Sequence, residues 1–427
     1  MHVIVMGAGP AGLAAALALH QQSTDSSPIR VTVLELRPSI QTLGGSVNLT
    51  PLAMRYLDGL GVGQHLRPLG MQVSHIEMMS HRTGSSLGQL WPNVDALRVR
   101  RQDLVEAMVA TVRGAVSDKH IQLRYGVKIT SIIEEEGSVK VRFTDTTITG
   151  SRGEQEDSEE SSIQGDILLG CDGIHSFVRS SLVDPDRQRT YSGRATAYGF
   201  IPVSEPGNAG IAAADGSPAV KGTTLVTAQL GSLLLSFFEP SRKTLFLATV
   251  MAQPETPDAR DGRRATGKEK DVVQKDLLRR FRGGRLAGLQ DALGRCEEWV
   301  SFPVYMLPPG GVWSKGRALL LGDAAHAMPP QGESTGVAIE DAVLLARVFS
   351  RRDTRSVAQL FADYEVLRRP VIKKTYDETM FRWGKVGDRS WFGTVVMEWF
   401  TMLYIWVINS WSKDSFGRDV RSLELPV

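Results

Sequence analysis

The chain opens with short apolar runs separated by a glycine-rich turn. Residues 2–6 read HVIVM, which predicts a buried strand. An Ala- and Leu-rich segment, from about Ala11 to His20, predicts a helix, and a second apolar run over 29–34 ends at Glu35. The order of strand, turn, helix and strand predicts one βαβ unit at the N-terminus.

Farther along, the pattern of apolar positions changes. Over about 192–302, alternating segments such as LLLSFF and TLFLATV predict strands of a second sheet. The last predicted strand, 317–321, is followed by a strongly apolar helix after Gly336, and a helical region is predicted over 357–427. Apolar residues spaced four apart predict an amphipathic helix packed on the second sheet: Val273, Leu277 and Phe281.

Composition and charge exclude several classes of protein. A chain of 427 residues is too long for one compact core, so two or three domains are expected. Lys and Arg number 49 against 47 Asp and Glu, so the net charge of +2 gives no reason to expect a nucleic acid as partner. The two cysteines, Cys171 and Cys296, exclude a disulfide framework and fit a reducing compartment. Because glycines interrupt the first apolar run, it is not a secretion signal, and a cytoplasmic protein is predicted.

Three motifs at the ends of predicted strands carry candidate chemistry. In the first, GAGPAG, Gly7, Gly9 and Gly12 form the pattern G-x-G-x-x-G. The first glycine permits a tight turn, the second lets the backbone approach a pyrophosphate, and the third lets the helix pack on the strand. The N-terminus of that helix then faces the phosphates with its N–H groups. Glu35, at the end of the second strand, is placed to bind a ribose hydroxyl.

The other two motifs also follow predicted strands. CDGIHSFVR, over 171–179, comes after the strand at 167–169 and turns into a helix. GDAAH, over 322–326, follows the strand RALLL, and the Asp323 carboxylate at that strand end can hold a polyol hydroxyl. Residues 332–336 then open a long helix, whose N-terminus can stabilise developing negative charge.

Together these motifs resemble those of the class A flavoprotein monooxygenases, the family of para-hydroxybenzoate hydroxylase and the salicylate hydroxylases. The chain looks most similar to fungal members of that family. GAGPAG with Glu35, CDGIHSFVR and GDAAHAMPP stand in the family's order and rough spacing. Arg101 and Leu104, in RRQDL, match the family's R-x-x-L helix.

The predicted fold is α/β, with a Rossmann-type FAD-binding domain, a mixed-sheet substrate domain and a C-terminal helical tail. The FAD-binding domain is expected to be discontinuous, over 1–72, 96–190 and 303–356. The substrate domain is expected over 73–95 and 191–302, and the tail over 357–427.

The resemblance also implies a role for each motif. The glycines of the first motif and Glu35 would bind the adenosine half of FAD, and Arg101 would contact the dinucleotide. Residues 172–173 belong to a motif associated with both FAD and NAD(P)H. Asp323 would bind the ribityl chain, and the region 330–336 would border the isoalloxazine ring. The predicted cofactor-binding residues are Gly7, Gly9, Gly12, Glu35, Arg101, Asp172, Gly173, Asp323, Pro330 and Gly336.

The sequence departs from the family pattern at two places. Where family members often read G-x-G-x-N, this chain reads GESTG, so backbone N–H groups or Thr335 are expected to meet the pyrimidine edge of the flavin. Many relatives carry an arginine near the place that Tyr198 occupies here. Tyr198 and the nearby Arg194 are therefore the residues expected to position the substrate, and no protein residue is expected to act as a nucleophile.

The predicted activity is that of an FAD-dependent monooxygenase. The resemblance implies that NAD(P)H reduces the flavin and that O₂ then forms a C4a-hydroperoxide. This species would hydroxylate or epoxidise an electron-rich small organic molecule, with fungal secondary metabolism as the expected setting. Two alternatives stay open: a flavin reductase or dehydrogenase of the same fold that inserts no oxygen, and a membrane-bound flavin-binding partner without turnover.

Two other kinds of catalytic site are disfavoured. GESTG also fits the nucleophile elbow G-x-S-x-G of hydrolases, but no strand directly precedes the serine and no histidine follows His326. The eight histidines are scattered and form no H-E-x-x-H motif, so no metal site is predicted.

The C-terminal stretch 391–411, WFGTVVMEWFTMLYIWVINSW, raises the question of membrane contact. It is long enough to cross a bilayer and carries one charge, Glu398. Trp391 and Trp411 would stand at the two edges of a span. Against this, Glu398 would cost about 3 kcal/mol near the centre of a bilayer. The pattern leaves open a spanning helix, an interfacial helix or lid, and a helix packed on the body.

Overall fold

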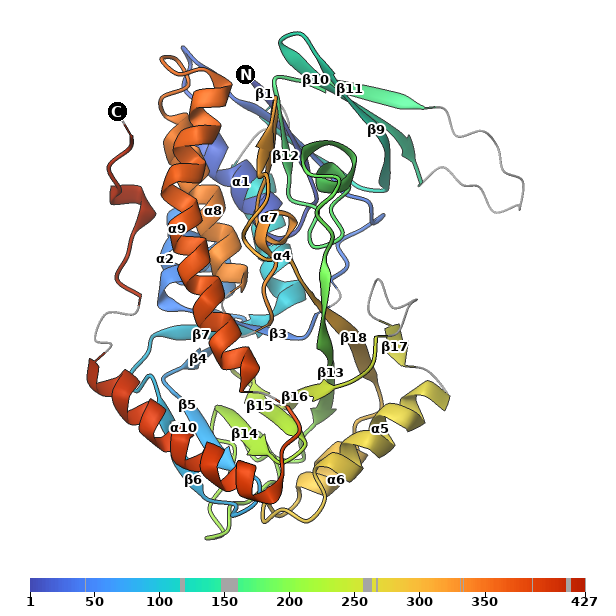
Figure 1. Cartoon of the computed structure of the whole chain (residues 1–427), viewed down its shortest axis with the longest axis vertical. Coiled ribbons are helices and arrows are strands. Elements are labelled where there is room, and N and C mark those ends of the chain that lie inside the picture. The colour runs from blue at the N-terminus through green and yellow to red at the C-terminus, as the bar shows by residue number, and fades with distance from the viewer. Residues whose placement is uncertain are drawn as a thin grey trace.

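The α/β architecture predicted from the sequence is present, with two large sheets stacked along the long axis of the molecule (Figure 1). The long helix α9 (Val357–Gly384) runs beside both of them, and its start is fixed by a capping box between Ser356 and Gln359. The computed structural model describes residues 1–42, 44–115, 120–146, 160–255, 263–265, 268–330, 332, 334–385, 387–411 and 416–426.

The first sheet has six strands and contains the predicted βαβ unit. Every neighbouring pair is parallel except β19 with β20. Parallel strands are covered on both faces, which explains why they read as continuous apolar runs. In spatial order the strands are β19 (Ser314–Lys315), β20 (Ala318–Leu320), β12 (Ile167–Gly170), β1 (His2–Met6), β2 (Arg30–Leu34) and β8 (Ile121–Arg124).

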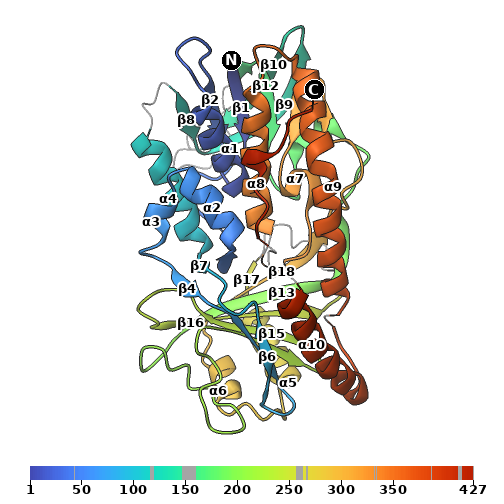
Figure 2. The same cartoon turned by 90° about the vertical axis from the view of Figure 1, so that its left-hand side faces the viewer.

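Helices cover one side of this sheet, and a small antiparallel sheet covers the other (Figure 1). Helix α1 (Pro10–Gln21) lies between α4 (Arg101–Ala115) and α8 (Ser334–Phe349), as Figure 2 shows. The small sheet consists of β9 (Val127–Glu135), β10 (Ser138–Asp145) and β11 (Ser161–Gly165). Shorter elements of this half are α2 (Pro51–Gly59), α3 (Gly63–Leu66), α7 (Asp323–His326) and a π-helix over Arg179–Val183.

The second sheet has eight strands, and only the pair β14–β5 is parallel. Alternate residues of a strand point to opposite faces. Ala197 accordingly lies in the apolar core beneath helices α5 (Lys268–Arg280) and α6 (Leu289–Gly294), whereas Tyr198 lies on the other face. In spatial order the strands are β17 (Arg263–Ala265), β18 (Trp299–Met306), β13 (Thr190–Pro202), β16 (Thr244–Ala252), β15 (Gly231–Phe237), β14 (Thr223–Ala228), β5 (Ile76–Ser80) and β6 (Ser86–Leu90).

A third small sheet and the C-terminal segment complete the fold. The small sheet is formed by β3 (Ser46–Leu49), β7 (Ala96–Arg100) and β4 (Met71–Val73). Helix α10 (Trp391–Trp411) lies beside β6 at the lower edge of the molecule (Figure 1). A short 3₁₀ helix, Val420–Ser422, follows and packs on α8.

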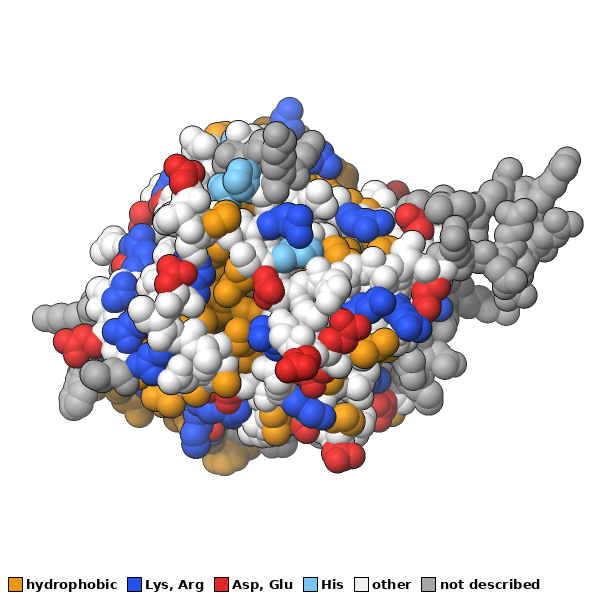
Figure 3. Space-filling model, turned by 90° about the horizontal axis from the view of Figure 1, so that it is seen from above, with side chains coloured by type: hydrophobic (Ala, Val, Ile, Leu, Met, Phe, Trp, Pro, Cys, Tyr) orange, Lys and Arg blue, Asp and Glu red, His pale blue; other side chains and the backbone are white. Residues whose placement is uncertain are grey.

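The division into domains stays a prediction, which the packing supports. One large apolar core surrounds the six-stranded sheet, and a separate core lies between the eight-stranded sheet and α5 and α6. At the end of the molecule that carries the N-terminus, Figure 3 shows Lys and Arg side chains interspersed with Asp and Glu. The described side chains on this face therefore form no continuous basic surface of the kind that binds nucleic acid.

Candidate cofactor and substrate site

The three sequence motifs meet at one edge of the six-stranded sheet. They follow β1, β12 and β20, which are parallel neighbours, so their carboxyl ends lie together. The backbone N–H of Cys171 donates to the Met6 carbonyl at 2.8 Å, and that of Leu321 donates to the Gly170 carbonyl at 3.0 Å. In open α/β sheets this edge is where ligands bind.

The three glycines of GAGPAG have different surroundings. Gly7 has φ of +98°, and a Cβ there would collide with the Cys171 carbonyl. A Cβ on Gly12 would overlap the Gly7 carbonyl oxygen, so this glycine permits close helix packing. A Cβ on Gly9 would meet nothing within 4 Å. Because Gly9 is the N-cap of α1 and no acidic side chain occupies its first turn, the open space at this helix end suits a phosphate group.

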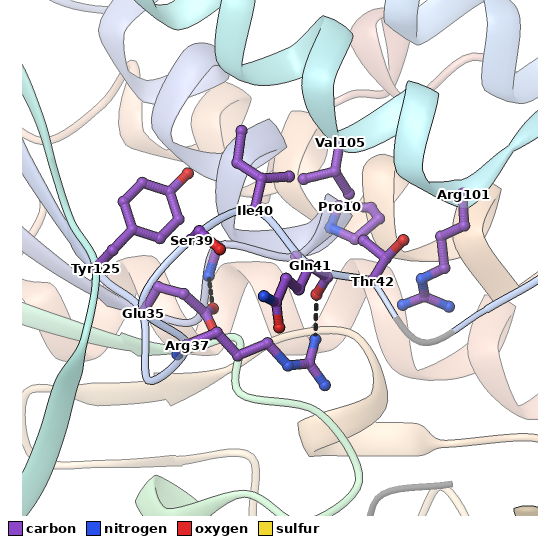
Figure 4. Close-up of a pocket in the computed structure, with 12 residues that line it drawn as sticks. Pro10, Glu35, Arg37, Ser39, Ile40, Gln41, Thr42, Arg101, Val105 and Tyr125 are labelled. Atoms are coloured by element: carbon purple, nitrogen blue, oxygen red, sulfur yellow. Dashed lines mark hydrogen bonds between the residues drawn. The ribbon is translucent and has the colours of Figure 1, made fainter. Parts of the chain in front are cut away.

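A cavity of about 160 Å³ extends from this helix end and is drawn in Figure 4. The Glu35 carboxylate is fixed at one end, where it accepts hydrogen bonds from the backbone N–H of Ala8 at 2.8 Å and of Arg37 at 3.0 Å. Arg37 in turn donates to the Gln41 carbonyl at 2.7 Å. Arg101 lines the opposite end in Figure 4. The elongated shape, with a carboxylate at one end and a guanidinium at the other, fits part of an extended dinucleotide.

Arg101 connects the strand-end motifs to the eight-stranded sheet. It is the first residue of α4, and its backbone N–H donates to the Gly45 carbonyl at 3.0 Å. Burial lowers the pKa of the Arg101 guanidinium, and the nearby Asp323 carboxylate and Tyr198 hydroxyl act in the opposite direction. The Arg101 guanidinium therefore interacts electrostatically with Asp323 of the third motif and with Tyr198 of the eight-stranded sheet.

Asp323 lies at the start of α7 in a tightly packed turn. A Cβ on the preceding Gly322 would lie 3.2 Å from the Ala11 Cβ and 3.3 Å from the Ala338 Cβ. Asp323 is exposed to solvent, although protein atoms crowd around its position. This enclosure raises the pKa of Asp323, and the positive charge of Arg101 opposes the rise. A carboxylate so placed can accept hydrogen bonds from the hydroxyls of a polyol chain.

Asp341, in α8, holds this turn in place and was not singled out from the sequence. Its Oδ2 accepts a hydrogen bond from the Gly322 N–H at 2.8 Å and lies 2.8 Å from His326 Nε2. The available signal was the acidic pair in the otherwise apolar helix VAIEDAVLL, because a buried acid needs partners.

In the second motif, one carboxylate oxygen of Asp172 caps the following turn and the other is without a partner among the described residues. Asp172 Oδ2 accepts hydrogen bonds from the N–H groups of Phe177 at 2.7 Å and Val178 at 3.2 Å. Its Oδ1 is buried without a partner among the described residues, and burial raises the pKa of this carboxyl. Gly173 has φ of +78°, and a Cβ there would meet nothing within 4 Å. The free oxygen beside open space fits a ligand hydroxyl or amide. Arg179 ties this motif to the third one by donating to the Ala324 carbonyl at 2.9 Å.

Aromatic rings line the face of the eight-stranded sheet opposite to α5 and α6. The ring of Tyr198 lies 5.9 Å from that of Phe246, between ring centroids. A Cβ on Gly45 would overlap the Phe246 ring, so the loop at 44–45 passes directly over this surface. We call the rings the aromatic wall: Tyr198, Phe200, Phe238, Phe246 and Phe302. Sequence reasoning missed the role of residues 44–45, for which two adjacent glycines were the signal.

The other predicted site residues have different surroundings, and their roles stay predictions. Arg194 Nη1 donates to the Trp383 carbonyl at 2.7 Å, and its guanidinium lies 5.0 Å from the Trp383 ring centroid, so Arg194 faces the end of α9. Gly336 lies in the first turn of α8, where a Cβ would be 3.1 Å from the Ala53 Cβ. Its missing side chain therefore serves the packing of α8 on α2. Pro330 is exposed beyond α7.

The parallel sheet with its strand-end motifs has the arrangement of a dinucleotide-binding fold, and a second sheet carries the aromatic wall. A family model described as an FAD binding domain matches residues 1–202 and 311–379. Phenazine 1,6-dicarboxylic acid hydroxylase PhzS of Lysobacter antibioticus is 28% identical over 389 residues, covering 86% of each chain. Salicylate hydroxylase of Pseudomonas putida is 26% identical over 388 residues, covering 87% of this chain and 82% of the relative.

A solved structure shows the same fold. Klebsiella pneumoniae HpxO complexed with FAD and uric acid matches with a TM-score of 0.75 and 22% identity, over 96% of this chain and 95% of that one. The chain belongs to the FAD-binding-domain family that comprises the class A flavoprotein monooxygenases. The predicted family, fold class and FAD cofactor are thus confirmed. Within the described residues, no group of three or more His, Cys, Asp or Glu side chains could hold a metal ion.

Proposed function

We propose that this FAD-dependent enzyme uses NAD(P)H and O₂ to insert one oxygen atom into an electron-rich organic substrate. For a hydroxylation, the substrate R–H, O₂, NAD(P)H and one proton give R–OH, NAD(P)⁺ and water. Two electrons come from NAD(P)H and two from the substrate, so four electrons reduce O₂ fully. Epoxidation of an alkene has the same electron balance.

The position of Arg101 carries this proposal. A Cβ on Gly44 would lie 2.6 Å from Arg101 Cδ, and a Cβ on the adjacent Gly45 would lie 3.2 Å from Tyr198 Cδ2, so Arg101 and Tyr198 both contact the same short loop. The charge of Asp323 also acts on the Arg101 guanidinium. A cofactor that extends from the cavity at Glu35 past Arg101 to Asp323 would place its far end beside the aromatic wall. A reaction between the cofactor and a flat substrate requires this juxtaposition.

The residues present fit FAD. Glu35 would accept from an adenosine ribose hydroxyl, and the N–H groups at the start of α1 would face the pyrophosphate. Asp323 would hold the ribityl hydroxyls, with Asp172 and Gly173 beside it. When bound, FAD would supply the electron transfer and the activation of O₂. The protein orients both reactants and excludes water with apolar rings.

The aromatic wall favours an aromatic substrate. Flat rings pack on the faces and edges of aromatic side chains, and the wall offers five of them. Tyr198 is the member that offers a hydroxyl, and we propose that it positions the substrate by a hydrogen bond. Arg194 acts as a positioning residue through Trp383, because its guanidinium holds the end of α9 against β13. The relatives named above, a phenazine hydroxylase and a salicylate hydroxylase, support this substrate class. The expected setting is secondary metabolism.

Oxygen consumption and product mass test the proposal together. The purified holoenzyme is incubated with NADH or NADPH and a panel of phenols, indoles and prenylated aromatics under ¹⁸O₂. We expect substrate-dependent oxidation of one nicotinamide cofactor, and one ¹⁸O atom in the product. Product that is changed but unlabelled would identify a reductase or dehydrogenase. A protein that binds FAD but oxidises no nicotinamide cofactor with any substrate would be a flavin-binding partner, and either result would contradict the monooxygenase. Asp323→Ala, stripped of flavin, is the negative control.

We further propose that the enzyme is cytoplasmic and that residues 391–411 bring it into contact with a membrane. Among the described residues, one helix, Trp391–Ser410, is long and apolar enough to cross a bilayer by length and composition. Only 17% of its most apolar window is buried, unlike the core helix of a soluble protein.

A further inference from the structure

Helix α10 is attached to the eight-stranded sheet and its following turn by its polar side. Glu398 is 3% exposed and accepts hydrogen bonds from Ser80 Oγ and Arg82 Nη2, each at 2.5 Å. One turn earlier Thr394 is buried, and near the C-terminal end Asn409 donates to the Gln89 carbonyl at 2.7 Å. The only carboxylate of α10 is therefore committed to the body of the protein.

The opposite side of α10 is apolar and faces away from the protein. Trp391, Trp399 and Trp406 are 62%, 69% and 62% exposed, and they recur at spacings of eight and seven residues, which places them on one side of a helix. Figures 1 and 2 show α10 at the outer edge of the molecule with no element beyond it. We call this surface the exposed face of α10: Trp391, Phe392, Val396, Trp399, Leu403, Trp406 and Val407.

Positively charged side chains lie beside rings of α10: the Arg82 guanidinium is 5.8 Å from the Trp391 ring centroid, and Lys385 lies near Phe400. Both acidic residues between α9 and the end of α10 are ion-paired: Glu398 with Arg82 at 2.5 Å and Asp388 with Arg280 at 3.1 Å. The Lys385 ammonium instead lies 5.0 Å from the Phe400 ring centroid, close to the same helix. An apolar, tryptophan-rich strip with positive charge at its border complements the interface of a membrane that contains anionic lipids.

We infer that α10 lies in the plane of an anionic lipid surface, with its exposed face at the boundary between headgroups and acyl chains. This orientation rests on the proposed membrane contact but not on the proposed oxygen chemistry. A spanning orientation would require Glu398 to leave Ser80 and Arg82 and enter the bilayer. An in-plane helix keeps these bonds and buries the three tryptophans at the depth that tryptophan prefers.

Vesicle binding tests the surface. The full-length holoenzyme is sedimented with vesicles of phosphatidylcholine alone or with 30% phosphatidylserine added. We expect binding to the mixed vesicles, and an apparent affinity at least about tenfold lower for the triple variant Trp399→Ser, Leu403→Ser, Trp406→Ser. The matched control is Val366→Ser with Leu69→Ser, which alters apolar residues that are 65% and 46% exposed elsewhere, and it should bind like the parent. Flavin content, measured for each variant, shows that it is folded.

Spin labels measure the orientation. The two native cysteines are buried, so a label reacts selectively with a cysteine introduced as Trp391→Cys, Trp399→Cys or Trp406→Cys. An in-plane helix places all three labels at similar depth. A spanning helix would place the label at 399 roughly 10 Å deeper than the other two, since a helix rises 1.5 Å per residue. That result would contradict the in-plane orientation but would still support membrane contact.

Other outcomes separate the proposals from one another. If no vesicle binding occurs while substrate-dependent O₂ uptake is normal, membrane contact fails and the chemistry stands. If vesicle binding and equal label depths are found without any O₂ uptake, the orientation stands and the proposed function fails. A dimer in the absence of vesicles that the triple variant abolishes would mean that a second copy covers the exposed face, which overturns the inference.

Discussion

Arg368 Nε donates to Asp341 Oδ1 at 2.5 Å, and neither side chain is exposed to solvent. The same guanidinium donates to Glu340 at 2.6 Å. Because the other oxygen of Asp341 accepts from the Gly322 N–H, this ion pair links α9 to the turn that carries Asp323. The geometry of the cofactor site thus depends on a charge in the C-terminal region, more than 40 residues away in sequence.

Replacement of Arg368 by leucine should destabilise the protein strongly. The variant leaves the Glu340 and Asp341 carboxylates buried without their shared ion-pair partner. Removing one member of a buried ion pair costs about 3–5 kcal/mol of stability. Urea unfolding of the flavin-free protein measures the loss. The control on the same helix is Lys373→Ala, whose pair with Asp377 is exposed and contributes less than about 1 kcal/mol. Equal effects of the two substitutions would contradict the assigned role.

Asp341 should make the unfolding free energy of the protein depend on pH in the acidic range. Burial alone would raise the pKa of Asp341, but the charges of His326 and Arg368 outweigh it and lower the pKa from 3.8 to about 2. Because the folded-state pKa is depressed, the stabilisation is fully present above about pH 4 and is lost as pH falls toward 2. It is on the order of 2 kcal/mol. Unfolding free energies from pH 2 to 7 should fall less steeply for Asp341→Asn than for the parent, and parallel curves would refute the prediction.

The strand-end motifs could be read from sequence because their physics is local. Gly7 and Gly12 lie within one turn, where their lack of a side chain has a direct steric reason. Glu35 follows β2 directly and Asp323 comes three residues after the end of β20, so parallel pairing alone brings them to one edge of the sheet. Apolar runs, glycine spacing and a carboxylate after a strand were therefore enough to predict the FAD-binding fold, and the assignment of single residues to FAD stays a prediction.

The remaining features depend on contacts between distant segments. The side chain of Arg194 is directed by Trp383, which lies 189 residues later, and no local pattern reports that contact. Gly45 is required by the Phe246 ring, about 200 residues away. The sequence left a span, a surface helix and a packed helix open for α10, because the partners of Glu398 on β5 and the following turn lie more than 300 residues away.

Substitution of each of two glycines by alanine should separate cofactor binding from packing. Gly9→Ala places a methyl group in open space at the start of α1, so the fold should tolerate it. The same methyl group would occupy space that we expect the FAD pyrophosphate to fill. We expect FAD affinity to fall at least about tenfold, with little change in the melting temperature of the apoprotein. Gly12→Ala should cost about 1–3 kcal/mol of stability, because its Cβ meets the Gly7 carbonyl. Flavin absorbance and thermal melts measure the two effects, and an opposite pattern would refute the assignment.

Asp323→Asn should strengthen the apoprotein while it weakens FAD binding. The pKa of Asp323 is raised by its enclosure, so the folded state favours the neutral form. Ionisation of this carboxyl therefore destabilises the folded protein. The loss of stability develops as pH rises from 3.8, the ordinary pKa, to the raised pKa of the folded state, and it remains at pH 7. A neutral amide removes the cost, which is less than about 1 kcal/mol because the side chain is open to solvent. A lower apoprotein melting temperature at pH 7, or unchanged flavin content, would contradict this role.

Tyr198→Phe should uncouple nicotinamide oxidation from oxygen insertion. The substitution keeps the ring of the aromatic wall and removes only the hydroxyl that we propose to position the substrate. A single hydrogen bond contributes about 0.5–1.5 kcal/mol, so product formed per NAD(P)H should fall by roughly twofold to tenfold, with the difference appearing as H₂O₂. Arg194→Ala instead loosens the end of α9, and it should raise KM more than it lowers coupling. Because both variants leave the FAD cavity intact, normal flavin content serves as the control. Intact coupling in Tyr198→Phe, together with an unchanged KM and intact coupling in Arg194→Ala, would show that neither residue positions the substrate.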